Sequence, residues 1–183
     1  MLAMSDTPID LFIPYFAKAG VPVAFLVPTP TGYEKSIMDA TAPIRQLLFD
    51  AQVHDYEAQE QGPSNKVLIP AHFVNYSDVT DSVASLYRPV TKKGDPRIWF
   101  SNLRKYCSPC NLLAIVVINK ELYVFNLSKP EIAAGIQYNG FAASIILYIL
   151  IFFTGLGSYS SYNDIYDHIY DDIYDDIEDS MDD

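Results

Sequence analysis

The chain has 183 residues, 12 Lys plus Arg, 23 Asp plus Glu and a formal net charge of -11. Half of the residues are hydrophobic, which excludes a disordered or collagen-like chain, and the length suits one domain. The acids are unevenly distributed, because residues 158–183 hold ten of them and no Lys or Arg. The remainder carries 13 acids against 12 bases, so it is nearly neutral and a polyanionic partner is not excluded.

Cysteine usage and the amino terminus indicate the compartment. Cys107 and Cys110 are too few for a disulfide scaffold, and no basic start followed by an apolar run marks a secretory signal. We therefore expect a cytoplasmic protein. One C-x-x-C lacks the second ligand pair that structural zinc requires, and it closes a predicted helix instead of opening one. Ordinary thiols are the favoured interpretation, with a zinc or redox pair as alternatives.

The first half of the chain alternates short apolar runs with turn residues. Residues 21–27 (VPVAFLV) predict a strand, because Gly20 and Pro28 bound the run. Residues 34–50 predict a short helix, a break, and a second helix that begins near Pro43. Residues 54–65 are polar and predict a loop. Four acids in and near this loop could bind a metal or act in acid–base chemistry, but neighbouring glutamines favour a solvated surface; these acids are Asp50, Asp55, Glu57 and Glu60.

The second half contains the clearest local signals. Residues 66–74 and 82–88 predict two strands, and residues 97–106 predict a helix that Pro109 ends. Residues 112–128 predict a β-hairpin, because two β-rich apolar runs flank the polar turn Asn119-Lys120-Glu121. About six strands and two or three helices without regular alternation predict an α+β domain or a small barrel.

A basic strip occupies residues 85–105, where six bases stand against the single acid Asp95. These bases are Arg88, Lys92, Lys93, Arg97, Arg104 and Lys105. Proline and glycine residues predict that much of the strip is an exposed, rather rigid loop. Long cationic side chains neutralise phosphates, and Arg also pairs with guanine edges. A solvated charged loop is the alternative interpretation.

The strip also carries a resemblance to a known family. The string Tyr87-Arg-Pro-Val-Thr-Lys-Lys-Gly-Asp-Pro-Arg-Ile-Trp-Phe100, followed by the predicted hairpin ending in Leu122-Tyr-Val-Phe-Asn-Leu-Ser128, resembles a region of type II restriction endonucleases. It is similar to the segment amino-terminal to the nuclease domain in the MvaI/BcnI family. The upstream segment 28–41 fits the same resemblance, which spans roughly residues 20–130.

The same region resembles the amino-terminal effector domain of EcoRII, which is a DNA-binding pseudobarrel. The resemblance implies a mixed or antiparallel β-pseudobarrel with two or three helices, and double-stranded DNA as the partner. It implies that cationic side chains converge on one outward, DNA-facing surface; the candidates are Arg88, Lys92, Lys93, Arg97, Lys35, Arg104 and Lys105. Trp99 is expected in the core or as a platform beneath the loop.

The sequence departs from the family where catalysis is expected. These nucleases bind Mg²⁺ through an Asp and a Glu-x-Lys motif, and no such set occurs in this chain. We therefore expect no catalytic residue, no metal ligand and no cofactor here, with Mg²⁺ needed only by a missing nuclease domain. The predicted function is a DNA-recognition module truncated before that domain. A complete but divergent Mg²⁺-dependent endonuclease is the alternative.

The carboxyl-terminal third differs in composition from the rest. Residues 132–163 contain no charged side chain, and residues 138–157 are long enough for a membrane helix of ~20 residues. A membrane-anchored interaction protein with its body in the cytoplasm is thus a further alternative, as is a buried apolar helix. Residues 158–183 contain a repeated tetrapeptide, mostly Ile-Tyr-Asp followed by a fourth polar residue. They predict a disordered acidic tail, which could mask the basic strip.

The abrupt change near residue 135 also fits a frameshift or a premature junction. The expected organisation is an amino-terminal segment, a DNA-recognition-like domain, an apolar segment and the acidic tail. Their bounds are 1–19, 20–130, 131–157 and 158–183.

Overall fold

The computed structural model describes residues 9–75 and 78–139. The helices are α1 (Ile9–Ala19), α2 (Pro30–Glu34), α3 (Ala42–Asp50), α4 (Leu103–Tyr106) and α5 (Pro130–Asn139), with 3-10 turns η1 (Pro63–Asn65) and η2 (Lys92–Gly94). The strands are β1 (Val23–Leu26), β2 (Met38–Asp39), β3 (Val67–Val74), β4 (Val79–Tyr87), β5 (Arg97–Phe100), β6 (Leu113–Ile118) and β7 (Glu121–Asn126). This mixed content confirms the α+β prediction.

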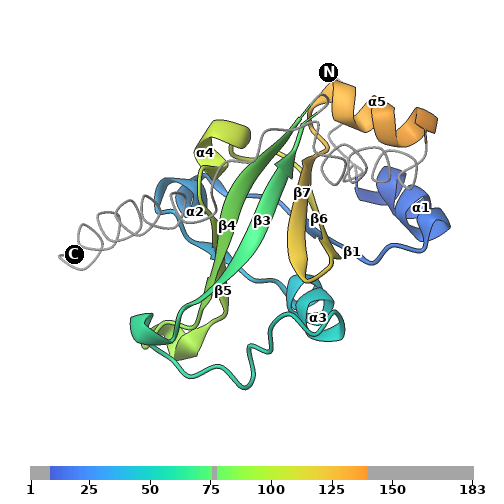
Figure 1. The fold of residues 1–183 in the computed structure, drawn as a ribbon. Helices are drawn as coiled ribbons and strands as arrows, with labels where there is room; N and C mark the ends of the chain where they lie inside the picture. Colours follow the sequence, from blue (N-terminus) through green and yellow to red (C-terminus); the bar gives the residue numbers. More distant parts are fainter. Residues whose placement is uncertain (1–8, 76–77, 140–183) are drawn as a thin grey trace.

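The strands form one sheet in the order β1-β6-β7-β3-β4-β5-β2, curled into a half-barrel (Figure 1). Neighbouring strands pair antiparallel, except that β3 and β7 run parallel from Ala71↔Leu122 to Val74↔Phe125. This parallel pair divides the sheet into two halves. One half is β1-β6-β7, the other is β3-β4-β5-β2, and within the sheet they meet only along the β3–β7 pair.

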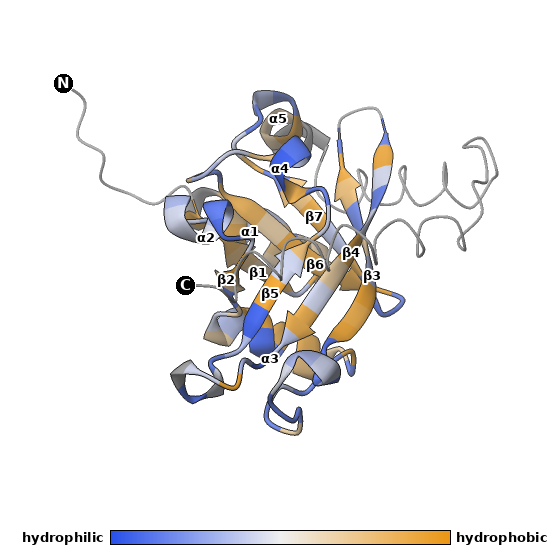
Figure 2. Cartoon of the chain, turned by 90° about the vertical axis from the view of Figure 1, so that its left-hand side faces the viewer, coloured by the Kyte–Doolittle hydropathy of each residue, from blue (hydrophilic) through white to orange (hydrophobic). Residues whose placement is uncertain are grey.

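Each face of the sheet has its own apolar core. The inner core places alternate strand residues such as Phe73, Ile98 and Leu122 against α3. The second core places Phe12 and Phe16 of α1 against β6, β7 and α5. Figure 2 shows the apolar stretches of the strands in orange. Because each fully buried large apolar side chain stabilises the fold by about 1.5–3 kcal/mol, these two layers account for much of its stability.

Local sequence explains several elements directly. In α3 the side chains of Ile44, Leu47 and Leu48 share one buried face at helical spacing, and Pro43 lies in the first turn where its missing N–H costs no bond. The β6–β7 hairpin turns at Asn119 and Lys120, both with positive φ, as type I′ turns require. The predicted helix near Pro43 and the predicted hairpin are both confirmed.

Other elements differ from the prediction. Residues 97–106 are not one helix, because they form β5 and then the single turn α4. Ile98 and Phe100 point into the inner core at strand spacing, which outweighs the helical pattern that Ile98 shares with later residues. The segment after Glu34 forms the short strand β2 instead of a helix. The strand predicted at 82–88 begins earlier, at Val79.

The carboxyl-terminal predictions fall largely outside the described residues. Helix α5 covers the start of the apolar segment, whereas residues 140–183, with most of the predicted membrane segment and the whole acidic tail, are not described. Across residues 9–75 and 78–139, the helices are all too short or too polar to cross a membrane.

The phenol of Tyr106 yields the first prediction. Its oxygen lies 2.8 Å from the Val74 carbonyl and 3.0 Å from the Val124 carbonyl, and it accepts the Asn126 N–H at 2.8 Å. Replacing Tyr106 by Phe should cost about 1–3 kcal/mol of unfolding free energy in urea, because buried polar groups of β3 and β7 lose their partner. Tyr87→Phe is the control, since no hydrogen bond of its hydroxyl occurs in the described part. Equal stability of the two variants would contradict this role.

Candidate nucleic-acid interface

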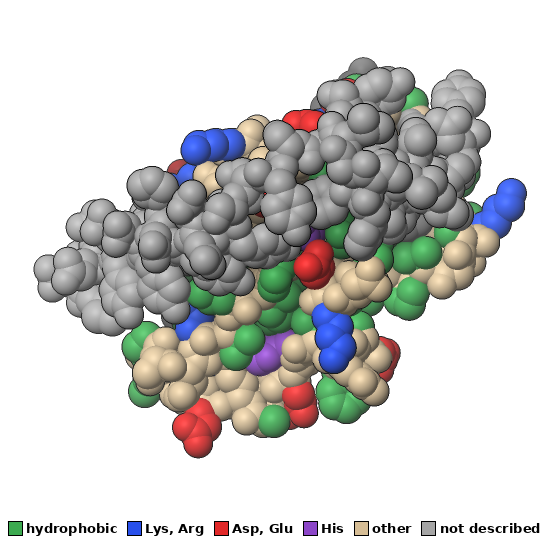
Figure 3. Space-filling view, viewed as in Figure 1, with side chains coloured by type: hydrophobic (Ala, Val, Ile, Leu, Met, Phe, Trp, Pro, Cys, Tyr) green, Lys and Arg blue, Asp and Glu red, His purple; other side chains and the backbone are tan. Residues whose placement is uncertain are grey.

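The predicted cations lie mainly along one border of the sheet. We call residues 30–39 and 91–106 the basic edge: it comprises α2, β2, η2, β5 and α4, and it faces the viewer in Figure 2. It holds six bases against three acids; the bases are Lys35, Lys92, Lys93, Arg97, Arg104 and Lys105, and the acids are Glu34, Asp39 and Asp95. The described charges visible in the view of Figure 1 are instead scattered singly (Figure 3). The basic edge is therefore the candidate surface.

Arg88 follows β4 and lies just outside the residues of the basic edge. Its Nε donates to the Gly94 carbonyl at 2.9 Å, and its Nη1 donates to the Tyr56 carbonyl at 3.0 Å. The guanidinium thus ties the turn after β4 to the loop after α3. Glycine is favoured at position 94 of this junction. Its φ is 71°, and an added Cβ would collide with the Gln61 side chain. Arg88 is half-buried, and its Nε and Nη1 already donate to carbonyl oxygens of the protein.

Arg97 is neutralised by neighbouring carboxylates. The register pairs it with Asp39 across β5 and β2, and its Nη1 binds the Asp39 carboxylate. Its Nη2 lies 4.0 Å from Asp95, and only 13% of its side chain is exposed. The expected convergence of Arg97 with Arg88 on one outward surface is therefore not found.

Arg104 fastens α4 to α2. Its Nη2 donates to the Glu34 carbonyl at 2.6 Å and to the Ser36 hydroxyl at 2.7 Å, and its guanidinium lies 5.9 Å from the centre of the Trp99 ring. The Tyr33 hydroxyl donates in return to the Cys107 carbonyl at 2.8 Å. Trp99 is partly buried against the inner core, consistent with the expected platform. Arg104 remains exposed, but its Nε and Nη2 already have protein acceptors.

The lysines behave differently. Lys35, Lys93 and Lys105 are exposed, and among the described residues their ammonium groups make no hydrogen bond or ion pair. Lys92 lies beside Lys93 in η2, although its side chain is not described. The structure thus divides the predicted set, with arginines that hold elements together and lysines that face solvent. Contact of any of them with DNA stays a prediction.

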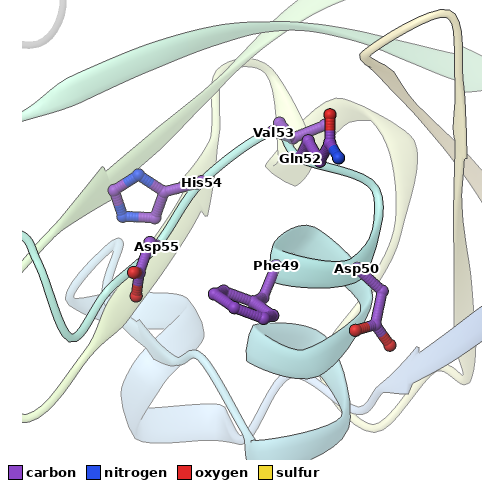
Figure 4. A pocket seen from close by; sticks show the side chains of 6 residues that line it. All are labelled: Phe49, Asp50, Gln52, Val53, His54 and Asp55. Carbon is purple, nitrogen blue, oxygen red and sulfur yellow. The ribbon is translucent and has the colours of Figure 1, made fainter.

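A shallow pocket lies at the end of α3, away from the basic edge. It has a volume of about 480 Å³ and is lined by Phe49, Asp50, Gln52, Val53, His54 and Asp55 (Figure 4). Burial lowers the pKa of His54, although the hydrogen bond to the side-chain oxygen of Gln59 and the charge of Asp55 act in the opposite direction. Two of the four acids weighed in the sequence, Asp50 and Asp55, line this open hollow. Within residues 9–75 and 78–139, no cluster of three or more His, Cys, Asp or Glu side chains could hold a metal.

The two cysteines are free thiols in different surroundings. Cys107 is buried and Cys110 is exposed, with a positive φ of 65° at Cys110. Burial raises the pKa of the Cys107 thiol to about 11. A thiol with so high a pKa is a poor nucleophile near neutral pH.

Sequence reasoning missed one polar cluster. His72 is buried in β3, where it lies between Asp81 of β4 and Glu121 of β7. A histidine inside an apolar strand signals that partners are needed, since buried polar groups are almost always hydrogen-bonded. The partners could not be named without the strand register, because Glu121 is 49 residues away and Asp81 faces His72 only through the β3–β4 pairing.

Comparisons with known proteins add no relative. No family model, no curated protein and no solved structure matches this chain. The resemblance to restriction endonucleases therefore rests on the quoted motif residues alone.

Arg88 generates the second prediction. Arg88→Ala should lower the unfolding free energy by about 1–3 kcal/mol in chemical denaturation, because carbonyl groups of two loops lose their donor. Arg88→Lys should restore little, since an ammonium cannot reproduce the planar fork. Lys93→Asn is the control, because it removes a nearby charge at a positive φ that Asn tolerates. Full stability of Arg88→Ala would refute the assigned role.

Proposed function

We propose that this chain is a binding module for double-stranded DNA, which contacts the phosphate backbone through the lysines of the basic edge. The observation that carries the proposal is the set of three exposed ammonium groups on Lys35, Lys93 and Lys105, unpaired among the described residues. Phosphates displace counterions from such groups, and this release drives binding without regard to base sequence.

The contacts of the arginines indicate which part of the DNA this surface would contact. Bidentate recognition of guanine needs a free guanidinium fork. The forks of Arg88 and Arg97 are engaged with carbonyl and carboxylate oxygens, and that of Arg104 with α2. We therefore expect these three residues to shape the surface, whereas the lysines supply point charges to phosphates. Binding through the basic edge should then be tolerant of base sequence.

The motif resemblance supports the same partner. The string from Tyr87 to Phe100 that resembles the restriction endonucleases includes η2 and β5, so it forms the centre of the basic edge. The proposal concerns binding alone. It assigns no step of cleavage to the described residues, which bring together no carboxylate cluster suited to a metal.

Salt dependence tests the proposal. A labelled duplex is titrated with the full chain over a range of salt concentrations, and the affinity is measured by fluorescence anisotropy. The test variant combines Lys35→Ala, Lys93→Asn and Lys105→Ala. Its affinity at low salt should fall, and the slope of log affinity against log salt should become shallower by about 0.9 for each phosphate that the variant no longer neutralises.

Charge removal elsewhere provides the matched control. Lys18 of α1 and Lys120 of the β6–β7 turn are also exposed and lie outside the basic edge. The double variant Lys18→Ala, Lys120→Asn should keep the wild-type slope. No binding by the wild type at low salt, or the same decrease in affinity in both variants, would overturn the proposal.

A further inference from the structure

The imidazole of His72 is enclosed by two carboxylates from neighbouring strands. Its Nδ1 lies 2.9 Å from Oδ1 of Asp81, and its Nε2 lies 3.0 Å from Oε2 of Glu121. The histidine side chain is 3% exposed, whereas those of Asp81 and Glu121 are 44% and 30% exposed. The ring stacks on Tyr123, with 4.7 Å between ring centres. A buried ring is thus bounded by acids that reach solvent.

The cluster of His72, Asp81 and Glu121 joins β3 to both of its neighbouring strands. His72 pairs with Asp81 in the β3–β4 register and with Tyr123 in the parallel β3–β7 register. Its two carboxylate contacts therefore reach the strands on either side of β3, Asp81 on β4 and Glu121 on β7. The contact with Glu121 spans the β3–β7 pair, where the halves β1-β6-β7 and β3-β4-β5-β2 meet.

Protonation decides how many of these contacts are favourable. An imidazolium carries N–H groups on both nitrogens and can donate to both carboxylates at once. A neutral imidazole has one N–H, so its other nitrogen presents a lone pair to a carboxylate oxygen. Burial opposes the charged ring, but the hydrogen bonds and charges of Asp81 and Glu121 outweigh burial and raise the pKa of His72.

We propose that His72, Asp81 and Glu121 form a pH-sensitive clamp, which holds the two halves of the sheet together when His72 is protonated and loosens their junction when it is neutral. The described titratable groups that face the ring are Asp81 on β4, and Glu121 and Tyr123 on β7. On β3 the neighbours on the same face, Pro70 and Val74, do not titrate. The three residues of the clamp lie outside the basic edge, so the clamp requires no contact with DNA.

The direction of the pH effect follows from the raised pKa of His72. The clamp contributes its full stabilisation below the unfolded histidine pKa of about 6.5, and it loses that contribution as pH rises through the folded pKa. The β3 and β7 amides should therefore lose protection on the alkaline side, while amides paired within either half should change less.

Hydrogen exchange of the full chain tests this directly. Protection factors, corrected for intrinsic exchange rates, are compared at about pH 5.5 and about pH 8.5, on either side of the ordinary histidine pKa. In the wild type, protection of the paired β3 and β7 amides should fall several-fold at the higher pH. The variant His72→Gln should remove this difference. His54→Gln is the matched control and should preserve it, because the hydrogen bond and the ring contact of His54 go to Gln59 and Tyr56, outside β3 and β7.

A titration of the folded protein keeps the proposal testable if a variant is unstable. The His72 ring resonances, followed by NMR against pH, should report a pKa above the ordinary value, and Glu121→Gln should lower that pKa while leaving the His54 pKa unchanged. A His72 pKa at or below the ordinary value would overturn the clamp. Wild-type protection of β3 and β7 that is indifferent to pH would overturn it equally.

Discussion

The parallel pairing of β3 with β7 is the constraint on which the fold depends. Each half of the sheet is assembled from antiparallel pairs, but residues about 50 positions apart must meet before the halves share a sheet. Side chains reinforce this junction on both faces. Tyr106 bridges the Val74 and Val124 carbonyls on the side of the inner core, and His72 connects Asp81 with Glu121 on the other. Polar contacts thus reinforce the junction between the halves, while apolar side chains fill the two cores.

In the basic edge, arginines and lysines have different roles. An arginine contributes several donors in a fixed plane, which suits the joining of backbone carbonyls from separate loops. Arg88 and Arg104 are used in this way, and Arg97 is balanced by Asp39 across the outermost strand pair. Lysines remain as the unpaired cations of the described part of this surface. A cluster of bases in a sequence therefore overstates the positive charge available to a partner, because some of the bases already bind carboxylate or carbonyl groups of the protein itself.

Sequence patterns predicted the parts of the fold that local periodicity determines. The hairpin around Asn119 and the helix after Pro43 carry both apolar periodicity and suitable turn or cap residues. The helix expected at 97–106 was wrong because Ile98 fits a helical period with later residues but a strand period with Phe100, and the inner core selected the strand. At the candidate site, the sequence located the basic edge. It could not reveal which cations are paired, because Asp39 is remote in the chain from Arg97, and Tyr56 is remote from Arg88.

The most direct measurement is an NMR map of the amide shifts that change when a short duplex is added at low salt. We expect the changes to concentrate in residues 30–39 and 91–106, with the resonances around Lys35, Lys93 and Lys105 moving most. The far border of the sheet, at β1 and α1, should be unaffected. Changes centred on β1 and α1, or none at a concentration where the duplex binds, would contradict the assignment of the basic edge.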